Sequence, residues 1–415
     1  RQSSGLSVLT SCKLVSGTLH SPLACLRVWF SGSDMKEKIP ANSVGLVTPQ
    51  IAECDTPFTF ANGALLGSHE LVYETYGELN SAGDNAVLIC HALSGSHHAA
   101  GFHANDDRRP GWWDLAIGPG KPIDTERLFV VCSNNLGCCD GSSGPNAINP
   151  DTGKPWGGQF PQPQVQDWVR SQKWLAEHLG ISRWAAVMGG SLGGMQALQW
   201  AIDFPDWVEH CVALAAAPGL TAQNIAFNEI ARHAILSDPD WHEGDYLAAG
   251  ALPTRGVALA RMVGHLTYMS ADGMSDRFGR ELREGSFAPD DNAEWVFQVE
   301  SYLRHQGSRF STQFDANTYV LMTRALDLFD LAGECGGDLT AALSNAQANF
   351  LIASFSSDWR FPPQRSIEIR DALMAAGKSI TYANIETDNG HDGFLLPNAH
   401  YEQLLGEWMR RVGPA

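Results

Sequence analysis

The sequence of 415 residues lacks several features that would assign it to a special class of protein. No apolar run approaches the roughly 20 residues that a membrane-spanning helix needs. Positive charge is scarce, because 28 Lys and Arg stand against 46 Asp and Glu, a formal net charge of −18. This excess of negative charge opposes non-specific binding to nucleic acid or to an anionic membrane. We therefore predict neither partner, and any anionic substrate needs a locally basic pocket.

The cysteines do not indicate a disulfide framework or a metal site. They are nine, an odd number, and Cys90, Cys132 and Cys211 lie in apolar runs where a cysteine acts as a small hydrophobic residue. The adjacent Cys138 and Cys139 lack the spacing of metal ligands. The pattern predicts reduced thiols and a cytoplasmic protein.

The beginning of the chain differs from the rest, since no acidic residue precedes Asp34. Its composition is that of a transit or signal segment, yet Met35 would be a natural start for the folded part. We interpret residues 1–42 as a disordered leader or an over-extended reading frame, and we expect no catalytic residue there.

After this segment, short apolar runs alternate with helix-like stretches, which is typical of an α/β protein with a mostly parallel sheet. Buried strands are predicted at 86–90, 128–132, 184–188, 212–216, 350–353 and 380–383. Helices are predicted near 165–179 and 399–411. Alternating polarity in 56–60 and 70–76, around Asn62-Gly63, predicts an antiparallel hairpin.

One interval breaks this alternation. Helical periodicity without convincing strands occurs at 222–236, 257–269, 293–304 and 319–330. Because open α/β sheets place their sites at the carboxyl ends of the strands, we interpret 219–345 as a helical lid over that edge. The core of the fold then consists of 43–218 and 346–415.

The most informative motif is Gly-x-Ser-x-Gly at 189–193, with Ser191 at its centre. It follows a predicted strand and precedes a helix-like stretch, which is the context of a nucleophile elbow. Glycines there permit a strained serine backbone and a close approach of strand and helix. The alternative is an ordinary tight turn between strand and helix.

A serine nucleophile needs a base, and the base needs a carboxylate to orient it. Asp358 and His391 each follow one of the late strands, in the chain order Ser, Asp, His that this architecture uses. Polar residues after strands are also common as caps and turns. Three of them in the right order instead predict a catalytic triad of Ser191, Asp358 and His391.

Two backbone N–H groups are expected to form an oxyanion hole. One belongs to Leu192, directly after the nucleophile, and the other to Leu93, in the loop after the strand 86–90. The nearby His97 and His98 raise the alternative of a metal site, but no third ligand is evident in the sequence. We predict no metal and interpret the two histidines as surface or pocket-rim residues.

With these residues in place, the chain resembles the homoserine O-acyltransferase family of methionine biosynthesis. The similar blocks lie at 91–95, 111–114, 141–145 with 148–150, 190–196 and 390–392. The resemblance runs from about Ser43 to the C-terminus and implies an α/β-hydrolase fold with a helical lid. It further implies a homodimer formed through the lid helices, and ping-pong acyl transfer from an acyl-CoA to L-homoserine through an acyl-serine, without a cofactor.

The residues agree with this chemistry. His391 would deprotonate Ser191 for attack on the thioester, and would then deprotonate the homoserine hydroxyl. The resemblance implies that Arg261 and Asp392 hold the carboxylate and the ammonium of homoserine. From the residues alone, Arg261 is equally well interpreted as a charge on the lid surface or in an internal ion pair.

Arg360 bears on the choice of acyl group, because acetyl-transferring relatives usually look aliphatic at this position. A succinyl group carries a distal carboxylate, which would be costly to bury without a cation. The chain also resembles the proteobacterial branch that is regarded as succinyltransferases. We predict conversion of succinyl-CoA and L-homoserine to O-succinyl-L-homoserine and CoA, the first committed step of methionine biosynthesis. The opposing interpretation is that Arg360 binds a CoA phosphate or faces solvent.

Four alternatives stay open at this point. Within enzymes they are a homoserine O-acetyltransferase using acetyl-CoA, a serine O-acyltransferase, and an esterase or thioesterase. The fourth is a non-catalytic binding protein of the same fold, which would be expected to have lost a member of the triad.

Overall fold

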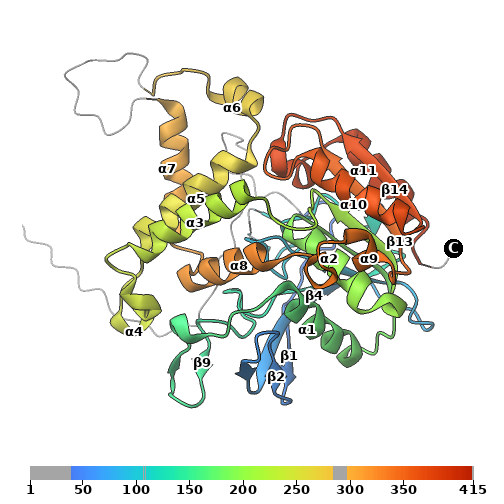
Figure 1. Cartoon of the computed structure of the whole chain (residues 1–415), viewed down its shortest axis with the longest axis horizontal. Coiled ribbons are helices and arrows are strands. Elements are labelled where there is room, and N and C mark those ends of the chain that lie inside the picture. Colours follow the sequence, from blue (N-terminus) through green and yellow to red (C-terminus); the bar gives the residue numbers. More distant parts are fainter. Residues whose placement is uncertain (1–38, 106, 108, 284–296, 414–415) are drawn as a thin grey trace, which may run out of the picture.

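The computed structural model describes residues 39–105, 107, 109–283 and 297–413. Its main sheet consists of β1 (Gln50–Cys54), β4 (His69–Tyr76), β5 (Ala86–Cys90), β8 (Phe129–Ser133), β11 (Trp184–Gly190), β12 (Val208–Leu214), β13 (Asn349–Phe355) and β14 (Ile380–Ile385). The eight strands lie in the order β1-β4-β8-β5-β11-β12-β13-β14 (Figure 1). β4 runs antiparallel to both β1 and β8, and the other neighbours are parallel. The sheet is therefore mostly parallel, as predicted.

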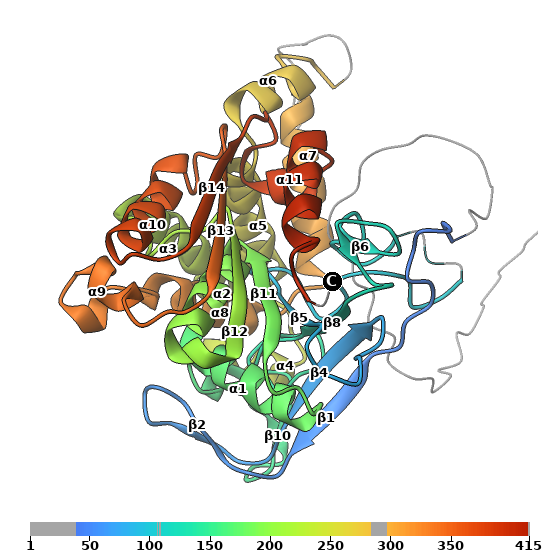
Figure 2. The ribbon, with the colours of Figure 1, turned by 90° about the vertical axis from the view of Figure 1, so that its right-hand side faces the viewer.

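Alternate side chains of the central strands enter two cores, one on each face of the sheet. In β5, Leu88 and Cys90 belong to one core, and Val87 and Ile89 belong to the other. Burial on both faces explains why these strands are continuous apolar runs in the sequence. The helices that cover the two faces are α1 (Val165–His178), α2 (Leu192–Asp203) and α10 (Pro363–Ala375) on the first, and α11 (Ala399–Met409) on the second (Figure 2).

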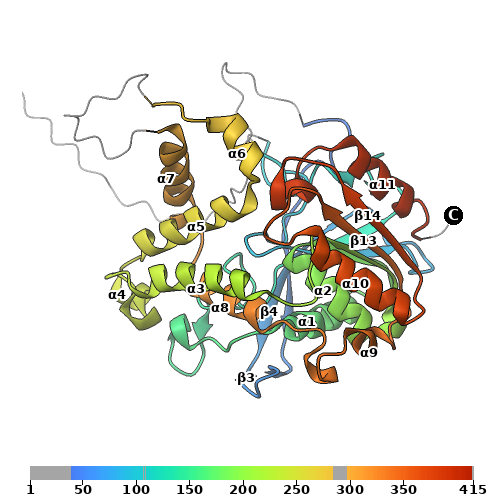
Figure 3. The ribbon, with the colours of Figure 1, turned by 45° about the horizontal axis from the view of Figure 1, so that its top comes forward.

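Between β12 and β13 the described chain is helical and adds no strand to the sheet. Its helices are α3 (Ala222–Leu236), α4 (Tyr246–Ala249), α5 (Thr254–Tyr268), α6 (Ala271–Phe278), α7 (Gln298–Ser311), α8 (Ala316–Leu328) and α9 (Leu339–Leu343). α5 packs against both α3 and α7, and these three helices lie to one side of the sheet (Figures 1 and 3). These three helices of the predicted lid region thus form a layer beside the sheet, whereas α9 packs against α10 of the core.

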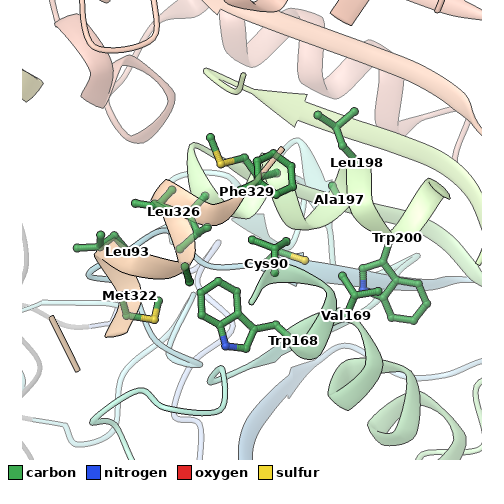
Figure 4. Close-up of a cluster of buried hydrophobic side chains, with 14 of the residues drawn as sticks. Cys90, Leu93, Trp168, Val169, Ala197, Leu198, Trp200, Met322, Leu326 and Phe329 are labelled. Carbon is green, nitrogen blue, oxygen red and sulfur yellow. The ribbon is translucent and has the colours of Figure 1, made fainter. Parts of the chain in front are cut away.

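Helix α8 fastens this layer to the core. Met322 and Leu326 on α8, and Phe329 just after it, belong to the same buried cluster as Leu93 and Trp168 (Figure 4). Because Leu93 lies in the loop after β5, the insertion is packed directly against a loop at the carboxyl edge of the sheet. This contact places the helical layer over the edge where the sequence predicts the site.

Short elements complete the fold. The two-residue strands form the pairs β2 (Phe58–Thr59) with β3 (Leu65–Leu66), β6 (Ile117–Gly118) with β7 (Ile123–Asp124), and β9 (Ile148–Asn149) with β10 (Lys154–Pro155). Short 3-10 helices lie at η1 (Gly157–Gln159), η2 (Pro205–Trp207), η3 (His242–Gly244), η4 (Gly333–Cys335) and η5 (Gly390–Leu395).

The predicted hairpin between 56–60 and 70–76 is wrong in its pairing. The turn at Asn62-Gly63 joins only β2 and β3, whereas β4 pairs with β1. β1 has only two buried residues, Ala52 and Cys54, so its sequence carries a weak strand signal. Burial of β4 between two neighbours decides its partner, which local alternation does not reveal.

Two predicted segments lie partly outside the residues that the structure describes. Of the predicted leader 1–42, only 39–42 are described, and the predicted helix 293–304 begins outside them and corresponds to α7. None of the described helices has the length and apolar character that crossing a membrane requires. The seven cysteines in the described part of the chain are free thiols, as predicted.

Candidate active site

Ser191 occupies a strained turn between β11 and α2. Its backbone has φ 57° and ψ −123°, a conformation that residues with a side chain rarely adopt. Both glycines of the motif are required by close packing, because a Cβ would lie 2.0 Å from the carbonyl oxygen of Cys90 on Gly193 and 2.5 Å from the same oxygen on Gly189. The Gly-x-Ser-x-Gly motif therefore has the geometry of a nucleophile elbow.

The three predicted triad side chains meet at the carboxyl edge of the sheet. Oγ of Ser191 lies 2.8 Å from Nε2 of His391, whose Nδ1 lies 2.7 Å from Oδ2 of Asp358. All three residues are at most 9% exposed. Such a chain of short contacts can pass the serine proton to the imidazole while the carboxylate orients the ring.

The second oxygen of Asp358 is also occupied. Oδ1 accepts hydrogen bonds from the backbone N–H groups of Arg360 and Phe361, at 3.0 and 2.9 Å. The ring of Phe361 meets the imidazole of His391 edge to face, with centroids 5.0 Å apart. The carboxylate and the imidazole are thus both held in place before a substrate arrives.

Leu93 and Leu192, the predicted oxyanion donors, both lie beside this triad. Leu192 is the first residue of α2, so its N–H has no acceptor within the helix. Leu93 lines the same pocket as Ser191, in a turn closed by the Gly95 N–H to Ala92 carbonyl hydrogen bond of 2.9 Å. The loop position of Leu93 is fixed further by the packing of its side chain against α8 (Figure 4).

A pocket opens at Ser191 and His391, and two opposite charges line it. Arg261 on α5 and Asp392 after the catalytic histidine both face it. The guanidinium of Arg261 is buried, 4.4 Å from the ring centre of Phe310 and 3.4 Å from the hydroxyl of Ser94. Burial raises the pKa of Asp392 to about 6, although His391 and Arg261 act to lower it. The pocket therefore offers a cation and an anion to a zwitterionic molecule.

Arg360 is buried in the wall of this pocket and is only 7% exposed, so it does not face solvent. Its guanidinium donates hydrogen bonds to Oγ1 of Thr267 at 2.8 Å and to Oδ1 of Asn228 at 3.2 Å, and stacks near the ring of Tyr268. Both hydrogen-bond partners are neutral. Within the described residues, no carboxylate lies within ion-pair distance of this arginine.

The remaining wall of the pocket is apolar, and several of its residues were not predicted. Tyr268 and Leu326 come from the insertion, whereas Trp112 comes from the segment between β5 and β8. Asn228 and Thr267, which hold Arg360, lie on α3 and α5 and carry no local signal of such a role. Only the tertiary contacts identify them.

His97 and His98 correct the prediction that they are surface or pocket-rim residues. They are 5% and 6% exposed, and their rings lie around the buried carboxylate of Glu74 together with His103. Burial would raise the pKa of Glu74, but the hydrogen bonds from His103 and His98 outweigh it and lower the pKa to about 2. Burial lowers the pKa of His97 to about 4, against the opposing effect of Glu74. The sequence did not identify Glu74 because it belongs to a distant strand.

Comparisons with known proteins agree with the fold and the motifs. A family model described as the alpha/beta hydrolase fold matches residues 85–396. The chain is similar to homoserine O-succinyltransferases of Saccharophagus degradans, at 58% identity over 379 residues, and of Pseudomonas entomophila, at 59% over 378. In both cases 91% of this chain and 100% of the relative are covered.

Two solved structures are similar over nearly the whole described chain. A homoserine O-acetyltransferase from Bacillus anthracis has a TM-score of 0.82 and 31% identity, covering 89% of this chain and 99% of its own. Esterase E22 has a TM-score of 0.80 and 31% identity, covering 88% and 100%. The same scaffold therefore occurs in proteins named for acyl transfer and for ester hydrolysis.

Proposed function

The chain belongs to the homoserine O-succinyltransferase family of α/β hydrolases, and on this premise we propose a ping-pong transfer of succinyl from succinyl-CoA to L-homoserine through Ser191. The observation that carries the mechanism is the pair of contacts from Ser191 to His391 and from His391 to Asp358, at 2.8 and 2.7 Å. The product is O-succinyl-L-homoserine, an intermediate of methionine biosynthesis. An acetyl donor is not favoured, since the relatives at 58–59% identity are named for succinyl transfer.

In the first half-reaction, Oγ of Ser191 attacks the thioester carbonyl while Nε2 of His391 takes its proton. The negative oxygen that forms is stabilised by the N–H groups of Leu93 and Leu192. When the tetrahedral intermediate collapses, the carbon–sulfur bond breaks, and the sulfur leaves as CoA with the proton from His391. A succinyl ester on Ser191 remains.

In the second half-reaction, His391 takes the proton of the homoserine hydroxyl, and the alcohol oxygen attacks the succinyl ester. Collapse of the second intermediate returns the proton to Oγ of Ser191 and releases the product. Transfer requires that the alcohol be held in line and that water be kept out. The apolar wall built by Trp112, Tyr268 and Leu326 suits this requirement.

We assign the homoserine carboxylate to Arg261 and its ammonium group to Asp392. Support comes from their placement in one pocket with Ser191, with opposite charges and with Arg261 buried. A guanidinium suits a carboxylate because its N–H groups can bind both oxygens. This pairing would distinguish homoserine from a simple alcohol, and an acyltransferase from an esterase of the same fold.

We assign the distal carboxylate of the succinyl group to Arg360. Support comes from a buried guanidinium in the pocket wall whose two hydrogen-bond partners, Thr267 and Asn228, are neutral. A buried cation without a carboxylate beside it is costly, and an anionic acyl group would offset that cost. An acetyl group would leave the cation uncompensated.

We also propose that the protein is a cytoplasmic homodimer formed through the helical insertion, with no cofactor and no nucleic-acid or membrane partner. The insertion supports this, because seven of the twelve exposed large apolar side chains in the described chain belong to it. They are Ile225, Ile230, Leu236, Leu252, Leu259, Leu266 and Leu328. Free thiols agree with the reducing cytoplasm.

The acyl donor is tested by comparing kcat/KM for succinyl-CoA and acetyl-CoA in the wild type, Arg360→Leu and Arg370→Leu. We expect the wild type to prefer succinyl-CoA, and Arg360→Leu to lose this preference by about 10²-fold, since removal of one partner of a buried charge pair costs about 2–5 kcal/mol. Arg370→Leu is the control, because Arg370 lies on α10 outside the pocket and pairs with Asp371.

Mass spectrometry of the intact protein provides an independent measurement. The enzyme is mixed with succinyl-CoA and acetyl-CoA together, without homoserine. The wild type should gain the mass of a succinyl group, and Ser191→Ala should gain no mass. A wild type that prefers acetyl-CoA, or an unchanged preference in Arg360→Leu, would contradict the assignment of Arg360.

A further inference from the structure

Three histidine side chains outside the active-site pocket surround one buried carboxylate, that of Glu74. Glu74 lies on β4 opposite Cys132 of β8 and has no exposed surface. His97, His98 and His103 reach it from the segment that follows β5. None of these four residues lines the pocket at Ser191. The group therefore needs an explanation other than acyl transfer.

The two oxygens of Glu74 have different surroundings. Oε2 accepts a hydrogen bond of 2.7 Å from the hydroxyl of Tyr76 and lies 3.0 Å from Nδ1 of His98. Oε1 instead faces two imidazole nitrogens, Nε2 of His103 at 2.6 Å and Nε2 of His97 at 3.7 Å. One oxygen is thus anchored by neighbours, and the other points at two potential ligands.

His97 is the side chain that hydrogen bonding within the protein does not account for. It is 5% exposed, and neither Nδ1 nor Nε2 has a hydrogen-bond partner among the described residues. Buried polar atoms are nearly always paired, so an unpartnered ring aimed at a carboxylate requires a further group. Nε2 of His97 points to Oε1 of Glu74, which indicates where that group would lie.

The spacing of the ligand atoms fits a small metal ion. One ligand atom each of Glu74, His97 and His103 lies within 4.8 Å of the others. Around tetrahedral Zn²⁺, with bonds of about 2.0–2.2 Å, ligand atoms lie about 3.4 Å apart. The observed 2.6 and 3.7 Å fall on either side of this value, so ring shifts of about 1 Å would suffice.

We infer that Glu74, His97 and His103 form a binding site for a divalent transition-metal ion, Zn²⁺ by its donor set, with a solvent molecule as fourth ligand. Two imidazoles and one carboxylate suit Zn²⁺ and disfavour Mg²⁺ and Ca²⁺, which take oxygen ligands. His98 and Tyr76 would orient the carboxylate from the second oxygen, the arrangement in which outer partners tune a metal ligand. His103, with 30% of its side chain exposed, gives the ion a route from solvent.

The position of the site assigns it a structural role. His97 and His98 directly follow Ser96, whose carbonyl oxygen accepts a hydrogen bond of 2.9 Å from the indole of Trp112, a residue of the active-site pocket. A metal joining this segment to β4 would fasten the loop that carries Leu93. A metal here would contradict the sequence prediction of no metal, and its binding does not depend on the proposed acyl transfer.

Zn²⁺ titration of the metal-free full-length protein, without a histidine tag, tests the site by calorimetry and by metal analysis after desalting. We expect one equivalent to bind tightly and the melting temperature to rise by about 3 °C at a hundredfold excess over Kd. Mg²⁺ should give neither effect. His103→Gln should weaken binding by at least the roughly 10–100-fold that loss of an outer partner costs.

Two further variants make the result decisive. Glu74→Gln should also lose Zn²⁺ binding. If the change at buried Glu74 prevents folding, His103→Gln still tests the site, because the side chain of His103 is partly exposed. His400→Gln is the matched control, since His400 is exposed on α11 and distant from Glu74 in sequence and contacts. Co²⁺ should give the visible spectrum of a tetrahedral nitrogen and oxygen site without thiolate bands. Absence of Zn²⁺ binding, or equal binding by His103→Gln and His400→Gln, would overturn the inference.

Discussion

The strand ends of the sheet and the helical insertion contribute to the same pocket in different ways. The sheet positions Ser191, Asp358 and His391, each in the segment that follows a strand, and the side-chain contacts between them are 2.7 and 2.8 Å. The insertion supplies Arg261, Tyr268 and Leu326, which reach the pocket by packing over it. We therefore expect the core to provide the groups that make and break bonds. We expect the insertion, through Arg261, to take part in substrate selection together with Arg360 and Asp392 of the core.

Two buried arginines differ in whether a carboxylate lies beside the guanidinium. Arg232 on α3 pairs with Asp327 at 2.7 Å and with Glu229 at 3.0 Å, so its charge is compensated within the protein. Arg360, which is equally buried, has neutral hydrogen-bond partners. This difference is why we assign an anionic ligand to Arg360 and none to Arg232.

The largest expected effect is on kcat, when the nucleophile of the triad is removed. Ser191→Ala should reduce kcat by about 10⁴–10⁶-fold, because loss of the nucleophile leaves only binding and the oxyanion donors. Release of CoA in the absence of homoserine, followed with a thiol reagent, measures this directly. Ser237→Ala, at the exposed end of α3, should leave the burst unchanged. A burst that persists in Ser191→Ala would show that the core does not supply the nucleophile.

The insertion should change acceptor use without changing acylation. Arg261→Lys keeps the charge but loses the two-pronged geometry, and we expect kcat/KM for homoserine to fall about 10²-fold while the CoA burst stays within about twofold. Steady-state kinetics with varied homoserine, beside single-turnover CoA release, separates the two steps. If Arg261→Lys lowered kcat/KM for homoserine and the rate of CoA release equally, Arg261 would not act specifically on the acceptor.

The smallest expected effect is on pH dependence. Burial raises the pKa of Asp392 to about 6, above its ordinary value, so its negative charge is present above pH 6 and is lost as the pH falls through 6. Since the ammonium of homoserine stays charged throughout, KM for homoserine should rise up to tenfold for each pH unit below about 6. The measurement is the ratio of kcat/KM for homoserine to the rate of CoA release without homoserine, between pH 5 and 8. Because His391 acts in both half-reactions, its own titration largely cancels in this ratio.

Asp392→Asn provides the control for this measurement. It should show a raised KM for homoserine at every pH and no additional increase below pH 6. If wild type and Asp392→Asn have the same pH profile for KM, the ammonium is bound elsewhere.

Much of the fold was predictable from local patterns. Continuous apolar runs identified β5, β11 and β13 because strands buried on both faces need apolar residues throughout. The α/β-hydrolase fold and the family, predicted from short motifs such as the one around Ser191, are confirmed by the comparisons. The pairing of β4 was mispredicted, because the choice between neighbouring strands depends on burial and not on alternation.

Some residues of the candidate site were predictable from the sequence, and others were not. Ser191, Asp358 and His391 were found because each follows a strand, and parallel strands bring their carboxyl ends to one edge. Asn228 could not be found, since it meets Arg360 from 132 residues away along the chain and lies within an ordinary helix. Residues that only position a charge leave no local pattern.

By itself, the sequence determined the alternation of strands and helices, the strained turn of the nucleophile and the chain order of the triad. These features depend on steric limits and periodicities that act within a few residues. Only the tertiary structure decided that Arg360 is buried against neutral partners and that three histidines gather around Glu74. Those contacts join a loop to a separate strand, or a loop to two helices, and only packing of the whole chain brings them together.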